Sequence, residues 1–277
     1  MSSRKQLVIN ADDFGFTPDV NEGIIEAHCY GILTATTIMA NGAAFDHAAG
    51  LARQSPGLDV GCHLVLVGGR SLVSGAALPA SVARLLRAIA TRQMNVYDEL
   101  RTQVTRIIQA GLEPSHLDTH KHTHLAPPVL EAVARLGEEF SIPWVRRPMD
   151  FPLSGQHGAA ASVKRLTSAG IGLLRGRFHR VLEEHHCRTT DYFAGFQITG
   201  RLRTKQLVEL MAVIPEGSTE LMCHPGRCGE ELRNAPTRLK ESREAELAAL
   251  TAPEVREAVK RAGIELVNYR QLADAPL

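Results

Sequence analysis

The stretch QLVINADDFGFTP (Gln6–Pro18) illustrates how the whole chain is organised. Its apolar first half predicts a buried strand, and the acidic pair Asp12 and Asp13 comes directly after that strand. Thr17 followed by proline is typical of a helix N-cap with Pro in the first turn. A buried strand that leads straight into a helix predicts an α/β protein with a parallel sheet.

The same alternation of short apolar runs and longer amphipathic runs continues along the chain. It predicts strands over residues 6–10, 36–40, 58–66, 116–119, 143–146, 219–223 and 264–267, and helices near 18–31, 48–51, 82–91, 96–110, 128–140, 202–213 and 241–262. About seven parallel strands with crossover helices predict one α/β domain over residues 1–277, folded as a distorted, TIM-like (β/α) barrel. Residues 149–200 have little pattern and predict an irregular insertion or lid.

The composition argues against several classes of protein. The chain has 277 residues, of which 44% are hydrophobic and 22% charged, with a net charge of +1. This balance predicts no nucleic-acid partner, and the lack of an apolar run near ~20 residues predicts no membrane span. The five cysteines are scattered and odd in number, which is typical of reduced thiols in a cytoplasmic protein. A homo-oligomer would fit the Ala, Leu and Val that recur on several helices, although a monomer's core would use these residues equally well.

Polar residues gather where the predicted strands end. They are Asp12, Asp13, Asn41, His63, the histidines between 120 and 124, and His224. In an α/β barrel the carboxyl ends of the strands share one face, and active sites lie on that face. Taken singly, several of these residues have structural explanations. The acidic pair could form an Asx turn, and His63 could be a satisfied core histidine.

A purely structural role does not readily account for the segment HLDTHKHTH (His116–His124). This segment holds four histidines, an Asp and a Lys, in a chain with 12 histidines in all. Residues 118, 120, 122 and 124 share parity, so an extended segment would point these four side chains the same way. Neutral imidazole is a common nitrogen ligand of metals in proteins, and the cluster therefore predicts metal binding.

A further histidine motif, CHPGRC (Cys223–Cys228), follows another predicted strand. Its cysteines and His224 suggest a structural zinc site, but the motif lacks the second cysteine pair usual in such sites. We therefore favour a catalytic role for His224. One Asp and two or more His on one rim predict a metal site with open positions, suited to zinc or another transition ion. With a spare carboxylate as base and a histidine as acid, such a site hydrolyses an amide or an ester.

Four motifs together carry a family resemblance. NADDFG (Asn10–Gly15), GCHLVL (Gly61–Leu66), HLDTHKHTH and CHPG (Cys223–Gly226) resemble the motifs of the YdjC-like carbohydrate deacetylases, in the same order. That family includes chitooligosaccharide deacetylases and deacetylases associated with hopanoid biosynthesis. The resemblance extends over residues 6 to about 270, and HLVLVGGR (His63–Arg70) looks closer to the hopanoid-associated branch.

The resemblance implies a distorted barrel that holds one divalent cation, zinc or magnesium. It implies removal of acetyl groups from N-acetylglucosamine units of an oligosaccharide or glycolipid. By the family motifs, Asp13, His63 and His120 would bind the metal. Asp12 would be the general base, and His224 would assist the departing amine. The residues expected to meet the substrate are His122, His124, Arg146 and Asn41.

Two other kinds of protein stay open at this point. The same barrel and metal site would suit a phosphoesterase or a cyclic amidohydrolase, which would turn over phosphate esters or cyclic amides. A non-catalytic protein that binds sugar or metal would bind its ligand tightly and release no acetate. Replacing Asp12 separates catalysis from binding, because only an enzyme would lose turnover.

Overall fold

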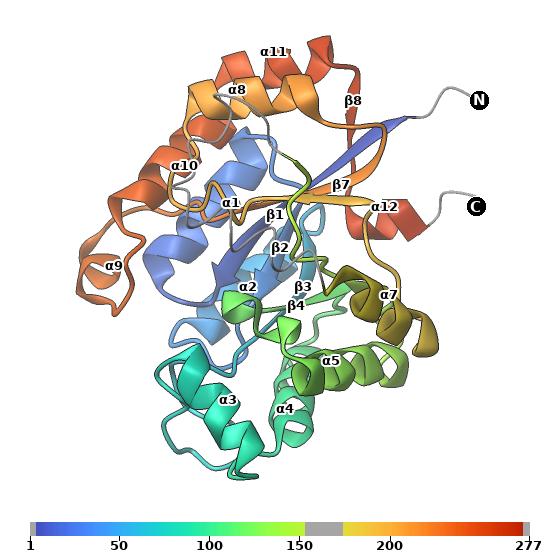
Figure 1. The fold of residues 1–277 in the computed structure, drawn as a ribbon. Helices are drawn as coiled ribbons and strands as arrows, with labels where there is room; N and C mark the ends of the chain where they lie inside the picture. The colour runs from blue at the N-terminus through green and yellow to red at the C-terminus, as the bar shows by residue number, and fades with distance from the viewer. Residues whose placement is uncertain (1–3, 153–173, 274–277) are drawn as a thin grey trace.

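The fold is a curled parallel sheet surrounded by helices, in a computed structural model that describes residues 4–152 and 174–273 (Figure 1). The strands are β1 (Lys5–Phe14), β2 (Ala35–Ile38), β3 (Asp59–Leu64), β4 (His116–Thr119), β5 (Trp144–Val145), β6 (Tyr192–Ala194), β7 (Gly217–Cys223) and β8 (Ile264–Leu266). The order across the sheet is β5-β4-β3-β2-β1-β7-β6, with all these neighbours parallel. β8 pairs with the first residues of β1, Lys5 to Leu7. It lies along the same edge of β1 that pairs with β2 further along the strand, from Asn10 onward.

The two ends of the sheet meet, so the sheet closes into a distorted barrel. Two isolated parallel bridges join the β5 side to the β6 side: Trp144 pairs with Arg188, and Asp150 pairs with Phe193. The N–H of Phe151 also donates to the carbonyl of Phe193. The predicted distorted α/β barrel is confirmed. The sheet of the described residues has eight strands, and β6 is the one that the sequence pattern missed.

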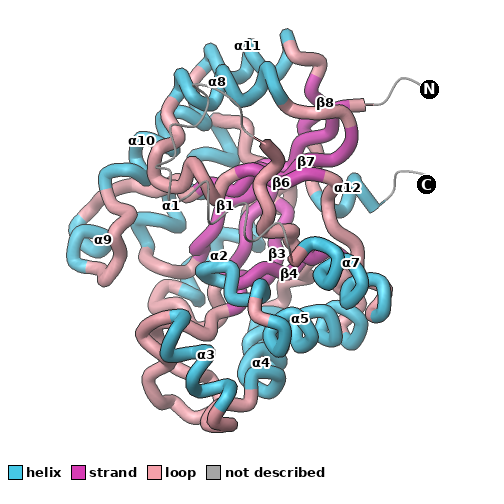
Figure 2. Tube along the Cα trace, viewed as in Figure 1, coloured by secondary structure: helices cyan, strands magenta, loops and turns pink. Residues whose placement is uncertain are grey.

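Helices cover the outside of this barrel (Figure 2). They are α1 (Pro18–Tyr30), α2 (Phe45–Gln54), α3 (Val82–Ala90), α4 (Val96–Gln109), the 3-10 helix η1 (His120–Leu125), α5 (Pro127–Glu139), α7 (Arg175–Glu184), α8 (Thr204–Val213), α9 (Glu230–Asn234), α10 (Glu241–Thr251), α11 (Pro253–Arg261) and α12 (Tyr269–Ala273). In the direction shared by Figures 1 and 2, α8, α10 and α11 lie on one side of the sheet, and α3, α4 and α5 lie on the other. α1 begins as predicted, because Thr17 Oγ1 accepts the N–H of Val20 and Pro18 is the first helical residue.

Two predicted elements differ from the structure. The helix predicted over 241–262 is two helices, α10 and α11, because Pro253 cannot continue the hydrogen-bond ladder and instead begins a new helix. Residues 149–200 are not irregular throughout, since they contain α7 and β6, and β6 pairs with β7. The part of that predicted insertion over 153–173 lies outside the described residues.

The composition predicts reduced cysteines and no membrane-spanning segment. The five cysteines are all free, as predicted for reduced thiols. Across residues 4–152 and 174–273, no helix combines the length and the apolar character that crossing a membrane requires.

Candidate active site

The chain turns sharply at the end of β1, and this turn presents Asp12 and Asp13. Asp13 has a φ of 71°, in the left-handed region that non-glycine residues rarely adopt. The N–H of Phe16 donates to the carbonyl of Asp13, and the N–H of Gly15 donates to Asn21 Oδ1 at 2.6 Å. The following loop and α1 therefore hold the turn in a conformation that is typical of functional sites.

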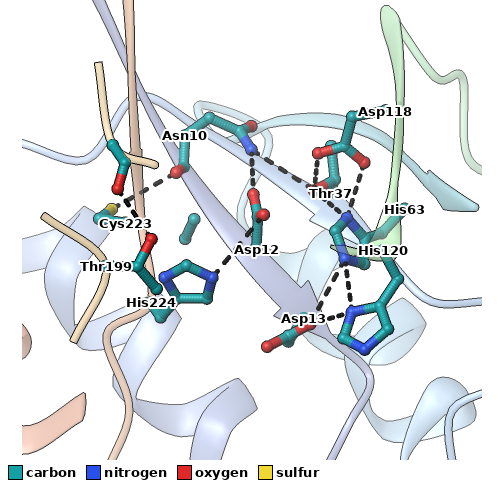
Figure 3. A network of polar contacts seen from close by, with 12 residues as sticks. Asn10, Asp12, Asp13, Thr37, His63, Asp118, His120, Thr199, Cys223 and His224 are labelled. Atoms are coloured by element: carbon teal, nitrogen blue, oxygen red, sulfur yellow. Dashed lines mark hydrogen bonds and ion pairs between the residues drawn. The ribbon is translucent and has the colours of Figure 1, made fainter. Parts of the chain in front are cut away.

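Three side chains from the carboxyl ends of β1, β3 and β4 meet beside this turn (Figure 3). Asp13 Oδ1 lies 3.4 Å from His63 Nε2 and 3.3 Å from His120 Nδ1. The two imidazole nitrogens lie 3.2 Å from each other. His63 lies in β3 and His120 directly follows β4. Residues far apart in the sequence thus form a donor triangle of one carboxylate oxygen and two nitrogens.

The donor triangle fits a divalent metal ion on two grounds. Ligand atoms that share a zinc ion at about 2.1 Å lie about 3–3.5 Å apart, and the three separations fall in that range. Asp13 Oδ1 is also buried, and it has no hydrogen-bond partner among the described residues. Buried polar atoms are nearly always paired, so this oxygen has the environment of a metal ligand.

Asp118 in β4 contacts His63 on the side of the ring that faces away from Asp13. His63 Nδ1 lies 2.7 Å from Asp118 Oδ1, and the hydroxyl of Thr37 in β2 lies 3.2 Å from the same nitrogen. A carboxylate in this place orients the ring and turns Nε2 toward Asp13. Burial lowers the pKa of His63, but the carboxylates of Asp118 and Asp12 outweigh burial and raise that pKa to about 10. The surroundings therefore stabilise positive charge at this point.

The second oxygen of Asp13 binds Arg243, a residue of α10. Arg243 Nη2 donates to Asp13 Oδ2, and both side chains are buried. Burial raises the pKa of Asp13, but the guanidinium of Arg243 counters it, and the pKa lies well below its usual range. The ion pair keeps Asp13 ionised and leaves Oδ1 to face the two histidines.

Asp12 is held by Arg146, which follows β5. Arg146 Nη1 and Nη2 donate to the two oxygens of Asp12, at 2.8 and 2.6 Å. The same guanidinium contacts Asp118 and donates from Nε to Glu220 at 2.7 Å. Burial raises the pKa of Asp12, but Arg146 outweighs burial and the pKa lies well below its usual range. The carboxylate of Asp12 is therefore both fixed and ionised.

A cavity of about 510 Å³ opens over these residues, which is within the usual range for small-molecule sites. We call it the active-site cavity. Residues that line it include Asp12, Asp13, His120, His122 and His224, together with Phe16, Phe196, Arg238 and Arg243. Carboxylates, imidazoles and aromatic rings therefore surround one space.

His224 follows β7 and faces Asp12 (Figure 3). His224 Nε2 lies 3.9 Å from Asp12 Oδ2, and the backbone N–H of His224 donates to Glu246 of α10 at 2.6 Å. Burial lowers the pKa of His224 to about 4, although Asp12 raises it. The imidazole is therefore neutral at neutral pH, with Nε2 close to a carboxylate.

The histidines after β4 do not share one direction, contrary to the extended segment that their spacing predicts. Lys121 and His122 have φ values of 57° and 51°, and these turn the chain. As a result, His120 faces the donor triangle and His122 lines the active-site cavity. His124 packs beneath, where its Nε2 lies 3.0 Å from the carbonyl of Arg146.

Three residues predicted to meet the substrate, His124, Arg146 and Asn41, lie elsewhere. None of them is among the described residues that line the active-site cavity. Arg146 is 0% exposed, because carboxylates surround its guanidinium beneath the cavity. Asn41 Nδ2 donates to the carbonyl of Arg70 at 3.1 Å and so holds the loop after β3. A supporting role describes both positions better than a substrate contact does.

Three further residues shape the site without having been predicted individually as site residues. Asp118 has a local signal, since it lies two residues before His120 in the histidine-rich segment. Arg243 and Glu246 lie in α10, where charged residues normally face solvent, and both are 1% exposed. No local pattern distinguishes them from surface charges.

The fold and the site together define an α/β-barrel protein with a candidate metal centre on its active-site face, beside a carboxylate and a histidine. The family model described as YdjC-like protein matches residues 6–261, and the chain belongs to this family.

Relatives in this family cover nearly the whole chain. A carbohydrate deacetylase from Brevibacillus brevis is 34% identical over 272 residues, which cover 96% of this chain and 99% of that protein. A chitooligosaccharide deacetylase from an Enterobacter species is 31% identical and covers 97% and 99% of the two chains. A solved structure from Enterococcus faecalis V583, described as a candidate cellobiose-phosphate cleavage protein, is 27% identical, with a TM-score of 0.77 and coverage of 98% and 99%. The predicted family is confirmed, and the relatives' names agree with the predicted class of enzyme.

Proposed function

We propose that this chain is a metal-dependent carbohydrate N-deacetylase that removes acetyl groups from N-acetylglucosamine units of an oligosaccharide or glycolipid. The observation that carries this proposal is the donor triangle of Asp13, His63 and His120 beside Asp12 and His224. The names of the relatives, carbohydrate deacetylase and chitooligosaccharide deacetylase, support the class of substrate.

Asp13, His63 and His120 would hold the divalent ion. When bound, such an ion polarises the amide carbonyl and lowers the pKa of a water molecule. Two nitrogens and one carboxylate oxygen favour zinc or another transition ion over magnesium. Asp118 orients one imidazole, and Arg243 keeps the carboxylate ionised, so these neighbours prepare the donors for a cation.

Asp12 acts in this proposal as the general base. It lines the active-site cavity next to Asp13 and stays ionised at neutral pH. Arg146 binds both of its oxygens, so the carboxylate keeps one orientation toward the attacking water. A fixed base removes part of the entropic cost of bringing the proton acceptor to the water.

His224 acts on the departing nitrogen. The amine needs a proton before the C–N bond breaks, and the proton taken from water supplies it. His224 Nε2 is neutral and lies 3.9 Å from Asp12 Oδ2, so it can take up that proton and donate it to the amine. The products are acetate and the free amino sugar, which balances the addition of one water.

Acetate release from N,N′-diacetylchitobiose and from an N-acetylglucosaminyl lipid tests the proposal. The protein is stripped of metal and reloaded with zinc or magnesium, and we expect acetate only after reloading. The preferred substrate then distinguishes an oligosaccharide from a glycolipid. Bound metal without acetate from either substrate would contradict the proposal and favour a phosphoesterase or a cyclic amidohydrolase. His120→Ala is the matched control, because it removes one donor of the triangle.

A further inference from the structure

A second cavity, of about 780 Å³, lies at the end of the barrel opposite the active-site cavity. It is lined by the first residues of β1, β5 and β7, by α7 and by the chain between α7 and β6, and we call it the basal cavity. In Figure 1 this end of the barrel is the side where α7, α12 and both chain termini lie. Gln6 of β1 lines the basal cavity and Asp12 lines the active-site cavity, so the strand rise separates the two by about 20 Å.

Positive charge dominates the wall of the basal cavity. Its basic residues are Arg4, Arg147, Arg175, His179 and Arg188, and its acidic residues are Glu183 and Asp191. Asp191 Oδ2 accepts the N–H and the hydroxyl of Ser218 at 2.9 and 2.7 Å but keeps its charge, so four guanidinium groups face two carboxylates. A ligand that complements this wall is therefore an anion.

Several polar atoms of the same wall are left without partners. Arg147 and Trp144 are only 6% and 7% exposed. Arg147 Nε and Trp144 Nε1 nevertheless have no hydrogen-bond partner in the described part of the chain, and the same is true of Thr189 Oγ1 and His179 Nε2. An unpaired buried N–H costs about 1–3 kcal/mol. A group of such atoms around one cavity indicates a ligand that brings several acceptors.

The guanidinium groups of Arg147 and Arg175 also repel each other. Burial lowers the pKa of Arg147, and the charge of Arg175 lowers it further. Two like charges held at a cavity wall are relieved by an anion between them. An anion with two charges relieves them more than a carboxylate does.

We propose that the basal cavity binds a phosphomonoester of a small polar molecule. Guanidinium groups bind phosphate oxygens through paired N–H donors, and the indole N–H adds a further donor. A volume of about 780 Å³ leaves room beyond the phosphate for an organic group beside Trp144, Leu182 and Tyr192. The site is separate from the proposed catalytic residues and does not depend on their function.

Trp144 provides a direct readout, because it is the one tryptophan of the chain and lines the basal cavity. Its fluorescence is followed while the full-length protein is titrated with glucose 6-phosphate, with inorganic phosphate, or with glucose. We expect a saturable change with glucose 6-phosphate and none with glucose. A change with inorganic phosphate of equal affinity would mean that the site recognises the phosphate group alone, and it would overturn the assignment to a phosphomonoester.

Variants assign the change to the basal cavity. Arg147→Gln and the exposed Arg175→Gln should each weaken glucose 6-phosphate binding by at least about tenfold, since each removes charge-assisted hydrogen bonds. Arg180→Gln, on α7 but outside the described lining of the cavity, should bind as the wild type does. His120→Ala should also bind normally, because it alters only the active-site cavity.

Three further results would overturn the proposal. One is the lack of any saturable change with both phosphate compounds. A second is unchanged binding in Arg175→Gln, with circular dichroism and thermal denaturation confirming that the variant is folded. Loss of binding in His120→Ala alone would place the anion in the active-site cavity and would equally reject the basal site.

Discussion

Arg146 binds Asp12 through both terminal nitrogens, at 2.8 and 2.6 Å, although 134 residues separate them in the sequence. Arg146 is fully buried, and the same guanidinium contacts Asp118 and Glu220. One cation therefore serves three buried carboxylates. This relationship sets the orientation and the charge of the proposed base, and it explains why Arg146 is not available to a substrate.

Replacing Arg146 should impair both folding and turnover. Arg146→Met leaves three carboxylates buried without their cation, and we expect a loss of about 3–5 kcal/mol in the free energy of unfolding. Arg146→Lys keeps the charge but cannot bind both oxygens of Asp12 in parallel. It should lose less stability, and it should lower kcat more than it raises KM. Urea denaturation and steady-state kinetics measure these effects.

The control is Arg101→Lys, which alters an arginine that is half exposed and paired with Glu139. Surface ion pairs contribute about 0–1 kcal/mol, so stability and kcat should stay near wild type. Equal behaviour of the Arg101 and Arg146 variants would contradict the assigned role.

Asp12→Asn should separate catalysis from metal binding. The side chain keeps its size but cannot accept the proton from water, so we expect kcat to fall by about 10²–10⁴. Metal content should stay at the wild-type level, because Asp12 is outside the donor triangle. Elemental analysis and acetate release measure the two properties. Full activity with metal bound would refute the role of Asp12 as base.

Asp118→Asn should act through His63. The carboxylate that lies 2.7 Å from His63 Nδ1 is lost, so the ring is held less firmly and is a weaker donor. Loss of such a supporting carboxylate typically lowers metal affinity by about 10–100-fold. Competition with a chelator measures this change. Asp46→Asn, at a carboxylate that is 95% exposed, should leave the affinity unaltered.

Gly23→Ala should disturb the loop that carries His224. A Cβ at Gly23 in α1 would lie 2.4 Å from the Cα of Gly226, so the helix and the loop would have to separate. We expect a loss of about 1–3 kcal/mol in stability, together with a lower kcat. Gly50→Ala is the matched variant, because a Cβ there meets nothing within 4 Å and lies within α2. It should stabilise the protein by about 0.5–1 kcal/mol, and thermal denaturation compares the two.

Glu246 should make stability depend on pH. Burial raises its pKa from 4.5 to about 7, despite the N–H groups of His224 and Gly200 that it accepts. The folded protein thus binds this proton more tightly than the unfolded chain. Its contribution is fully present below the unfolded pKa and is lost as the pH rises through the folded pKa.

In Glu246→Gln, the free energy of unfolding should therefore fall less steeply between about pH 5 and 7, by up to about 1.4 kcal/mol per pH unit. Urea denaturation across that range measures the slope. Glu254→Gln, at an exposed position in α11, should keep the wild-type slope. Identical slopes in all three proteins would show that Glu246 does not hold the proton.

Much of the fold could be predicted because the signals that define its elements are local. The apolar run before Asp12, the N-cap at Thr17 and the strand that begins the histidine-rich segment all match the observed elements. The elements that differ from the prediction, β6 and the pair α10 and α11, have weak local sequence signals. β6 has only three residues, and the break before Pro253 falls inside a pattern that is amphipathic on both sides.

For the candidate site, too, some features could be predicted from the sequence and others could not. Its polar residues could be placed on one face from sequence, because parallel strands bring their carboxyl ends together. The direction of each side chain could not, since it depends on the φ angles of Lys121 and His122 after β4. Those angles decide that His120 joins the donor triangle while His124 packs beneath it.

Local periodicity and capping therefore determine the order of strands and helices, and motif spacing determines the family. Long-range packing decides the partners of the buried charges. Arg243 reaches Asp13 across 230 residues of sequence and Arg146 reaches Asp12 across 134. A charge leaves water only when an opposite charge is already in place, and that condition is met only once the barrel has closed.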